Sequence, residues 1–102
     1  MNKPDKWIIL RIEDYYKVFG TWVGGYLDGD SWKINSGISK VEEDENNYMF
    51  YGYSGSCYVC NKNTYGTNYY TQSILDNILK KASKSDIDIE IMTKDTDFIN
   101  LI

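Results

Sequence analysis

The most regular pattern in the first quarter of the chain is a dense run of apolar residues that favour strands. Trp7 to Ile12 follows a Pro-Asp-Lys lead-in and predicts a first strand. Residues 13–14 supply a turn, and residues 15–23 predict a second strand. The glycines and the Asp-Gly-Asp group in residues 24–30 then favour a sharp reversal of the chain.

The middle of the chain continues with extended segments separated by short polar breaks. Residues 31–35 and 38–43 predict two further strands on either side of Ser36-Gly37. The apolar alternation of the second is poor, which indicates an edge strand. Residues 48–53 and 57–62 flank Ser54-Gly55-Ser56, and this three-residue link with a central glycine predicts a hairpin.

One segment has helical periodicity, and it follows a turn-rich link at residues 63–68. Thr71 or Ser73 is a candidate N-cap, and lysines gather near the other end, where the helix dipole favours cations. The apolar positions recur three and four residues apart: Ile74, Leu75, Ile78, Leu79 and Ala82. Residues 87–91 alternate isoleucine with acidic residues, which predicts a half-buried strand that joins an existing edge or pairs antiparallel. The tail from Thr93 ends in apolar residues that require burial.

This order of elements predicts the α+β class and a single domain over residues 1–102. We expect a curved antiparallel β-meander of five to six strands, covered on one face by a single amphipathic helix. A helix of about four turns cannot cover both faces of such a sheet. The other face, rich in aromatic residues, is therefore expected to be a partner interface, a ligand surface or the interior of a curled barrel.

Composition and charge exclude several classes of function. The 102 residues are 25% charged and 42% hydrophobic, as in ordinary globular domains. No apolar run approaches the roughly 20 residues of a membrane span, and no secretory leader is recognisable, which predicts a cytoplasmic protein with no membrane partner. Fifteen acidic and eleven basic residues, of which only Arg11 is arginine, disfavour general nucleic-acid binding.

The aromatic residues are the most informative part of the composition. Seven of the ten tyrosines lie between residues 48 and 70, among glycines, and the chain has no histidine. Tyrosine offers a flat apolar face and a hydroxyl at low entropic cost, so this cluster favours binding over catalysis. The thirteen Trp and Tyr residues cannot all be interior, because each buried polar group needs a partner. We expect the surplus to meet a ligand or another subunit of a homo-oligomer.

The candidate chemical motifs favour neither a metal, nor a cofactor, nor an enzyme. Cys57 and Cys60 form a C-x-x-C motif, but residues three apart in a strand point to opposite faces, and no histidine completes a zinc site. Reduced thiols are the simpler interpretation. Asp28-Gly29-Asp30 lacks the rest of a calcium loop. The serines and cysteines have no histidine base to activate them.

The candidate site combines aromatic rings, small-residue turns and a few cations, a set suited to a nucleotide-like ligand. Tryptophan and tyrosine rings would stack on the ligand or wall its pocket: Trp22, Trp32, Tyr53, Tyr58 and Tyr65. Ser54, Gly55 and Ser56 would supply amide and hydroxyl hydrogen bonds. Lys33, Lys62 and Arg11 would meet negative charge.

Three segments, residues 32–38, 54–58 and 60–66, resemble parts of small accessory proteins carried by phages and prophages. The resemblance covers about half of the chain and implies an anti-defence role in the cytoplasm of a host cell. It implies either a protein that captures and sequesters a nucleotide-like immune signal, or an inhibitor that binds a host defence protein directly, as anti-CRISPR proteins do. It transfers no binding residue. A phage structural or carbohydrate-binding module is the third alternative, because Tyr and Trp also stack on sugar rings.

Overall fold

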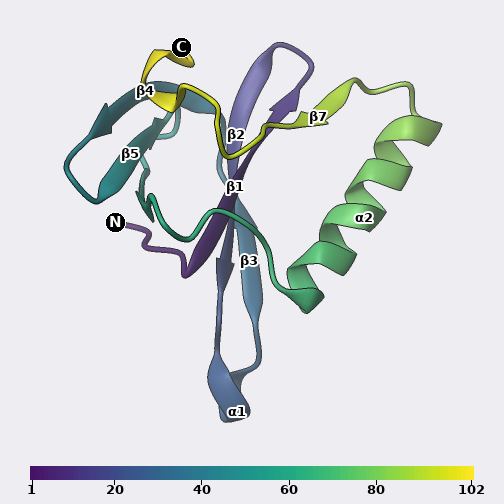
Figure 1. Ribbon diagram of the computed structural model, residues 1–102. Helices are drawn as coiled ribbons and strands as arrows, with labels where there is room; N and C mark the ends of the chain where they lie inside the picture. Colours follow the sequence, from purple (N-terminus) through teal and green to yellow (C-terminus); the bar gives the residue numbers. More distant parts are fainter.

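The chain folds into seven strands and one long helix, with two short helical turns (Figure 1). The computed structural model describes the backbone of residues 1–102 and every side chain except that of Tyr26. The strands are β1 (Lys6–Ile12), β2 (Tyr15–Trp22), β3 (Ser31–Ile34), β4 (Ile38–Glu43), β5 (Asn47–Gly52), β6 (Cys57–Asn61) and β7 (Ile89–Ile91). The helices are α1 (Gly25–Asp28), α2 (Tyr69–Lys84) and the 3-10 turn η1 (Phe98–Asn100).

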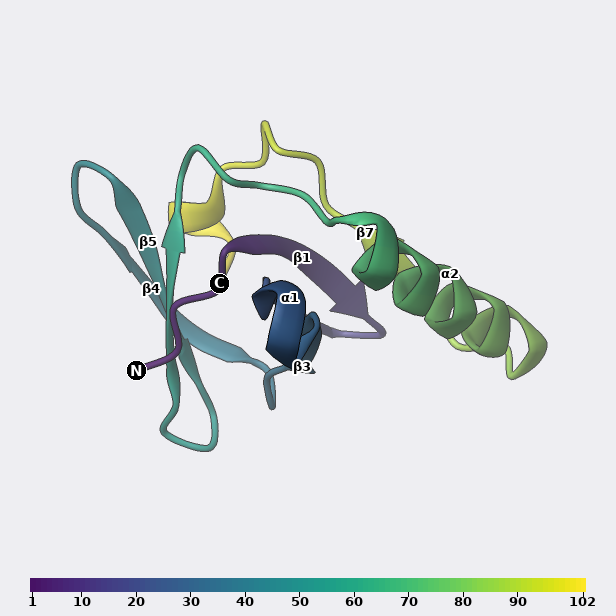
Figure 2. The same cartoon turned by 90° about the horizontal axis from the view of Figure 1, so that it is seen from below.

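The strands form two antiparallel sheets, and the long helix makes a third layer. The four-stranded sheet has the order β3-β2-β1-β7, and the three-stranded sheet has the order β4-β5-β6. Seen from below, the three-stranded sheet lies on one side of β1 and α2 on the other (Figure 2). The four-stranded sheet is therefore the middle layer, with a different cover on each face.

The α+β class is confirmed, but the expectation of one continuous meander is wrong. The chain leaves the first sheet after β3 and enters the second at Ile38, so Ser36-Gly37 is the point of separation. The second sheet then packs onto the face that was expected to meet a partner, a ligand or a barrel interior. The physical reason lies in β1, whose alternate residues supply both cores: Trp7 and Ile9 on one side, Ile8 and Leu10 on the other.

An aromatic core fills the space between the two sheets. It consists of Trp7, Tyr48, Phe50, Tyr65 and Phe98. The Trp7 ring lies at the centre, with centroid distances of 4.7 Å to Tyr65, 5.3 Å to Phe98 and 5.4 Å to Phe50. Edge-to-face pairs at such distances are favourable beyond the area that they bury. The apolar tail thus reaches its own subunit, because Phe98 is only 2% exposed.

The predicted helix is confirmed, but its N-cap is neither Thr71 nor Ser73. Asn68 caps it: the Asn68 side chain accepts from the Thr71 N–H, and the Thr71 hydroxyl accepts from the Asn68 N–H. Thr71 is the reciprocal partner in this capping box. Leu75 is 1% exposed and packs with Ile8, Leu10 and Phe19, which joins α2 to the middle layer.

The other local predictions are confirmed with small changes of boundary. The β5–β6 hairpin forms around residues 53–56, and β4 is an edge strand of its sheet. The isoleucine-rich segment joins the edge of the first sheet, where Ile89–Ile91 pairs antiparallel with β1. Residues 24–30 reverse the chain at the end of the β2–β3 hairpin, which extends away from the rest of the molecule (Figure 1). Gly24 is required there, because a Cβ would lie 1.5 Å from the carbonyl oxygen of Gly29.

Candidate functional site

Trp22 and Lys33 are brought together by the register of the β2–β3 pair. Trp22 lies opposite Ser31, and Gly20 lies opposite Lys33, so all four residues share one face of the sheet. Gly20 leaves room for this arrangement, because a Cβ on it would lie only 3.0 Å from the Trp22 ring. The Trp22 ring covers Gly20, and the Lys33 ammonium lies 5.6 Å from the ring centroid, within the range of a cation–π contact.

A surface pocket of about 310 Å³ opens at this position. Its lining consists of Met1, Asn2, Lys3, Trp22, Ser31 and Lys33. The N-terminal segment forms one wall because Asn2 bridges to Tyr58 in β6, with hydrogen bonds from the Asn2 N–H to Cys57 O (2.9 Å) and from the Val59 N–H to Asn2 O (2.8 Å). The β2–β3 hairpin forms the other wall. The pocket therefore combines a half-buried indole with lysines from both walls.

The charge at this pocket is positive although the chain as a whole carries −4. Lys3 and Lys33 are both exposed, and neither forms an ion pair with a described side chain. The nearby carboxylate of Asp5 accepts a hydrogen bond from the Val23 N–H at 2.7 Å, which ties it to the backbone. An anion bound over Trp22 would therefore meet two ammonium groups and the Ser31 hydroxyl.

The predicted site residues do not form one site. Ser54, Gly55 and Ser56 lie in the β5–β6 turn. The Gly55 N–H donates to Gly52 O within the turn (3.0 Å), and the Ser54 N–H donates to Ser36 Oγ in the link between β3 and β4 (3.1 Å). The neighbouring Tyr53 is 61% exposed and makes an edge contact with Tyr15, at 6.2 Å between centroids. These residues form a separate surface from the Trp22 pocket and do not line it.

Close to this turn lies a buried amide that sequence reasoning did not single out. Asn35 is 5% exposed, and its Oδ1 accepts from the Val18 N–H at 2.9 Å. This bond fixes the orientation of the amide, and it leaves Nδ2 buried without a partner among the described side chains. Because Gly52 has no side chain, the Ser36 and Ser56 hydroxyls gather over it together with this Nδ2.

The other predicted rings serve the fold. Tyr58 is 4% exposed and packs edge-on against Trp22, with 6.2 Å between centroids. The Tyr65 hydroxyl donates to Met92 O and accepts from the Ile9 N–H, and burial raises the pKa of this phenol. Trp32 lies on the opposite face of the sheet from Trp22, stacked on Phe19 at 5.5 Å. Only Trp22 of the five predicted rings lines the pocket.

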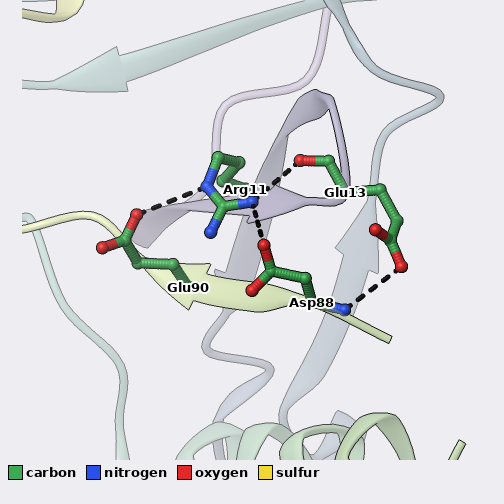
Figure 3. A network of polar contacts seen from close by, with 4 residues as sticks. All are labelled: Arg11, Glu13, Asp88 and Glu90. Carbon is green, nitrogen blue, oxygen red and sulfur yellow. Dashed lines mark hydrogen bonds and ion pairs between the residues drawn. The ribbon is translucent and has the colours of Figure 1, made fainter. Parts of the chain in front are cut away.

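Arg11 and Lys62 are also occupied by intramolecular contacts. Arg11 binds Asp88 (3.0 Å), Glu90 (3.4 Å) and the Glu13 carbonyl (2.8 Å), while Glu13 accepts from the Asp88 N–H (Figure 3). The hydrogen bond with Asp88 is the main cause of the raised pKa of Arg11. This network joins β7 to β1 and to the β1–β2 turn. Lys62 pairs with Glu43 at 2.6 Å, and that hydrogen bond raises the pKa of Lys62.

The cysteines of the C-x-x-C motif are both unbridged. Cys60 is fully buried, and burial raises the pKa of its thiol well above the usual range. Cys57 is half-buried, and desolvation raises the pKa of its thiol less strongly. No cluster of three or more Cys, Asp or Glu side chains suited to a metal is present among the described residues.

The pocket residues that sequence reasoning missed are Met1, Asn2, Lys3 and Ser31. Ser31 reaches the pocket because it lies opposite Trp22 in the β2–β3 pair. The sequence pattern does not reveal this register. Asn2 and Lys3 lie in a lead-in segment with no periodicity, and they reach the site by a bridge to β6 more than fifty residues away.

Comparison with protein-family models, curated proteins and solved structures finds no match. Within the described part of the chain, no helix combines the length and the apolar character that crossing a bilayer requires.

Proposed function

We propose that this protein binds a small anionic ligand with a planar ring, a nucleotide-like molecule, in the pocket over Trp22. The observation that supports the proposal is the joint placement of an indole face and two unpaired lysines around one concave surface. Base–aromatic stacking contributes about 1–3 kcal/mol per base, and the ammonium groups of Lys3 and Lys33 would bind phosphate oxygens. The lining contains no carboxylate, thiol or imidazole, so the proposal is capture without chemical change.

Capture of this kind has a simple biological consequence. A binder that holds a nucleotide signal lowers its free concentration by mass action and needs no catalytic step. This is the sequestration that the resemblance to phage accessory proteins implies. Assembly into a homo-oligomer stays a prediction, and the pocket as described is formed within one chain.

Isothermal titration against cyclic mononucleotides, cyclic dinucleotides and ADP-ribose derivatives tests the proposal. We expect at least one member to bind, with an affinity that falls as salt is added, because Lys3 and Lys33 are exposed and screened. Trp22→Ala should weaken binding roughly 10- to 100-fold through loss of stacking. Lys33→Ala should weaken it about fivefold at low salt.

Matched variants separate the pocket from general effects. Trp32→Phe changes a tryptophan on the other face of the same hairpin, and Lys84→Ala removes a lysine from the far end of α2; both should leave the affinity unchanged. Trp22→Phe keeps a ring and should retain most of the binding. Absence of heat with every nucleotide would remove the proposal, as would binding that survives both Trp22→Ala and Lys33→Ala in folded protein.

The protruding β2–β3 hairpin favours a second candidate, an inhibitor of a host defence protein. The end of the hairpin is formed by α1 (Figure 1). Leu27 in α1 and Val23 just before it are 90% and 56% exposed. An apolar tip on an extended hairpin is suited to insertion into a groove of another protein, and the acidic chain would steer it towards a basic partner. Affinity capture from a susceptible host should then recover a protein that Leu27→Asp fails to recover; equal recovery by both would exclude this use of the tip.

A further inference from the structure

The strand β7 ends the four-stranded sheet, so one of its edges pairs with β1 and the other is an outer edge (Figure 1). Towards β1, the Asp88 carbonyl accepts a hydrogen bond (2.8 Å) and the Met92 N–H donates one (2.9 Å). Hydrogen bonding alternates along an antiparallel ladder, so Glu90 also bonds to β1. The N–H and C=O groups of Ile89 and Ile91 therefore point away from the sheet. These backbone groups are a template for an added strand.

The face of this edge that looks towards α2 is apolar. Ile89 and Ile91 lie opposite Ile12 and Leu10 in β1 and share their face of the sheet. Beside Ile89, at the last turns of α2, the helix leaves a pocket of about 260 Å³. Its apolar lining consists of Ile12, Ile78, Ala82, Ile87 and Ile89. An added strand with apolar side chains on this face would bury the pocket lining and Ile91, which is 38% exposed.

The other face of the same edge is acidic. Asp88 and Glu90 lie there beside Glu13, whose carboxylate accepts from the Asp88 N–H at 3.1 Å (Figure 3). Arg11 binds Asp88 at 3.0 Å and Glu90 at 3.4 Å, so three carboxylates gather with one guanidinium. The Asp88 and Glu90 side chains are still 69% and 59% exposed. This face keeps an excess of negative charge that a further cation would neutralise.

The charges select among the possible occupants of the edge. If two copies of the chain paired through β7, Asp88 and Glu90 of one copy would lie beside those of the other, and like charges in such positions are destabilising. Lysine or arginine in the added strand would reverse the sign of this interaction. On the α2 face the exposed Lys81 borders the pocket, which disfavours cations there and leaves apolar residues as the suitable ones.

We propose that the outer edge of β7 binds an extended segment of a partner protein in which apolar and basic residues alternate, and that this segment joins the sheet as an antiparallel strand. Its apolar residues would lie opposite Ile89 and Ile91 and exchange backbone hydrogen bonds with them. Its basic residues would meet Asp88 and Glu90 on the other face. The proposal rests on neither function proposed above, because the Trp22 pocket shares no residue with this edge.

The test is an NMR titration of the whole chain, labelled with ¹⁵N, using a short end-blocked peptide in which valine and lysine alternate. At low salt the amide signals of Ile89 and Ile91 should shift. Their hydrogen exchange should slow about tenfold when the peptide is at roughly ten times its Kd, because both N–H groups become bonded. The Glu90 N–H already bonds to β1, so its exchange rate should change little.

Matched peptides test the backbone bonds and the charge without altering the protein. N-methylation of the valines removes the N–H groups that would bond to Ile89 and Ile91, and it should abolish binding. N-methylation of the lysines alters only N–H groups that would point to solvent, and it should preserve binding. A peptide that alternates valine with glutamate should bind at least about tenfold more weakly than the lysine peptide.

A charge reversal in the protein tests the acidic face. Glu90→Lys should weaken binding of the lysine peptide about tenfold, because an attraction is replaced by a repulsion. Glu45→Lys makes the same change of net charge in the β4–β5 turn, away from β7, and should leave the affinity nearly unchanged (Figure 1). Equal weakening by both variants would overturn the proposal.

The peptide titrations can overturn the proposal independently of these variants. They do so if the lysine peptide shifts neither the Ile89 nor the Ile91 amide, if the glutamate peptide binds as tightly, or if valine methylation leaves binding intact. Shifts of the same two amides that grow with protein concentration in the absence of peptide would identify a second copy as the occupant, and would also overturn it.

Discussion

Both faces of the four-stranded sheet carry apolar side chains from its strands, but a different layer covers each face. Against the three-stranded sheet, Trp7 meets four other rings, and the space between the layers is filled. Against α2, the contacts are mostly aliphatic, with Phe19 as the one fully buried ring, and a pocket stays open at Ala82. Rings that interlock edge to face leave little room, whereas a straight helix on a twisted sheet diverges from it.

This comparison explains the use of the aromatic residues. The abundance of rings suggested a surface with more ring area than the interior could absorb. Much of the cluster in residues 48–70 is instead absorbed by the second sheet, since Tyr58 is buried and Tyr48 and Tyr65 pack in the aromatic core. The rings that stay exposed, such as Tyr53 and Tyr69 at 61% and 100%, lie on different elements. The candidate binding surface therefore depends on one indole, Trp22, and its cationic neighbours.

The largest expected effect is the loss of stability when the side chain at the centre of the aromatic core is truncated. Trp7 is 1% exposed, touches four rings and donates its indole N–H to Asn61 O at 2.7 Å. Trp7→Ala should lower the free energy of unfolding by about 4 kcal/mol, because it leaves a cavity and an unpaired carbonyl. Urea unfolding followed by far-UV circular dichroism measures this loss.

The matched variant on the helix face is Leu75→Ala, at a residue that is also 1% exposed. Its smaller side chain and looser surroundings predict a loss of about 3 kcal/mol. A greater loss for Leu75→Ala than for Trp7→Ala would show that the helix layer, and not the aromatic core, dominates stability.

Alkaline pH is expected to have an intermediate effect on stability, and this effect also originates beside the aromatic core. Burial keeps the Cys60 thiol protonated in the folded state, while the unfolded thiol ionises near its ordinary pKa of about 8.5. The unfolded state therefore binds fewer protons at high pH, so stability is complete below that pKa and falls as pH rises above it. Between pH 7 and pH 10 the loss should be about 2 kcal/mol from this group.

Cys60→Ala provides the control for the alkaline effect. The variant should be less stable than the native chain at pH 7 but should lose less stability on going to pH 10, as thermal unfolding at both values would reveal. Cys57 is half-buried, so its removal should alter the pH slope less. Equal slopes for the native chain and Cys60→Ala would contradict the assignment.

Local signals in the sequence were sufficient for the elements but not for the layers. The glycine at the β5–β6 turn, the isoleucine alternation before Met92 and the apolar spacing in α2 each act within a few residues, and each predicted its element. The separation into two sheets depends on contacts between Trp7 and rings at residues 48 to 98, and no local pattern carries that information. Both faces of β1 are apolar, which is equally compatible with a barrel, an interface or a second sheet.

The site was predictable only in part for the same reason. Trp22 and Lys33 were singled out as types of residue suited to the ligand, and strand register places them together. Arg11 and Lys62 were equally suitable by type, but carboxylates remote in sequence bind them. Whether a cation is available to a ligand depends on its long-range neighbours.

The smallest expected effect is a gain in stability from a substitution just after the C-terminal end of α2. Asp86 has a φ of 56°, a left-handed conformation that glycine adopts without the steric cost of a Cβ. Asp86→Gly should raise the free energy of unfolding by about 0.5–1 kcal/mol, partly offset by the greater freedom of glycine in the unfolded chain. Asp86→Ala keeps the Cβ and should give no such gain in parallel urea titrations. If Asp86→Ala stabilises as much as Asp86→Gly, the gain comes from removing a carboxylate near the helix C-terminus, where the helix dipole disfavours negative charge. The turn at Asp86 is then unstrained.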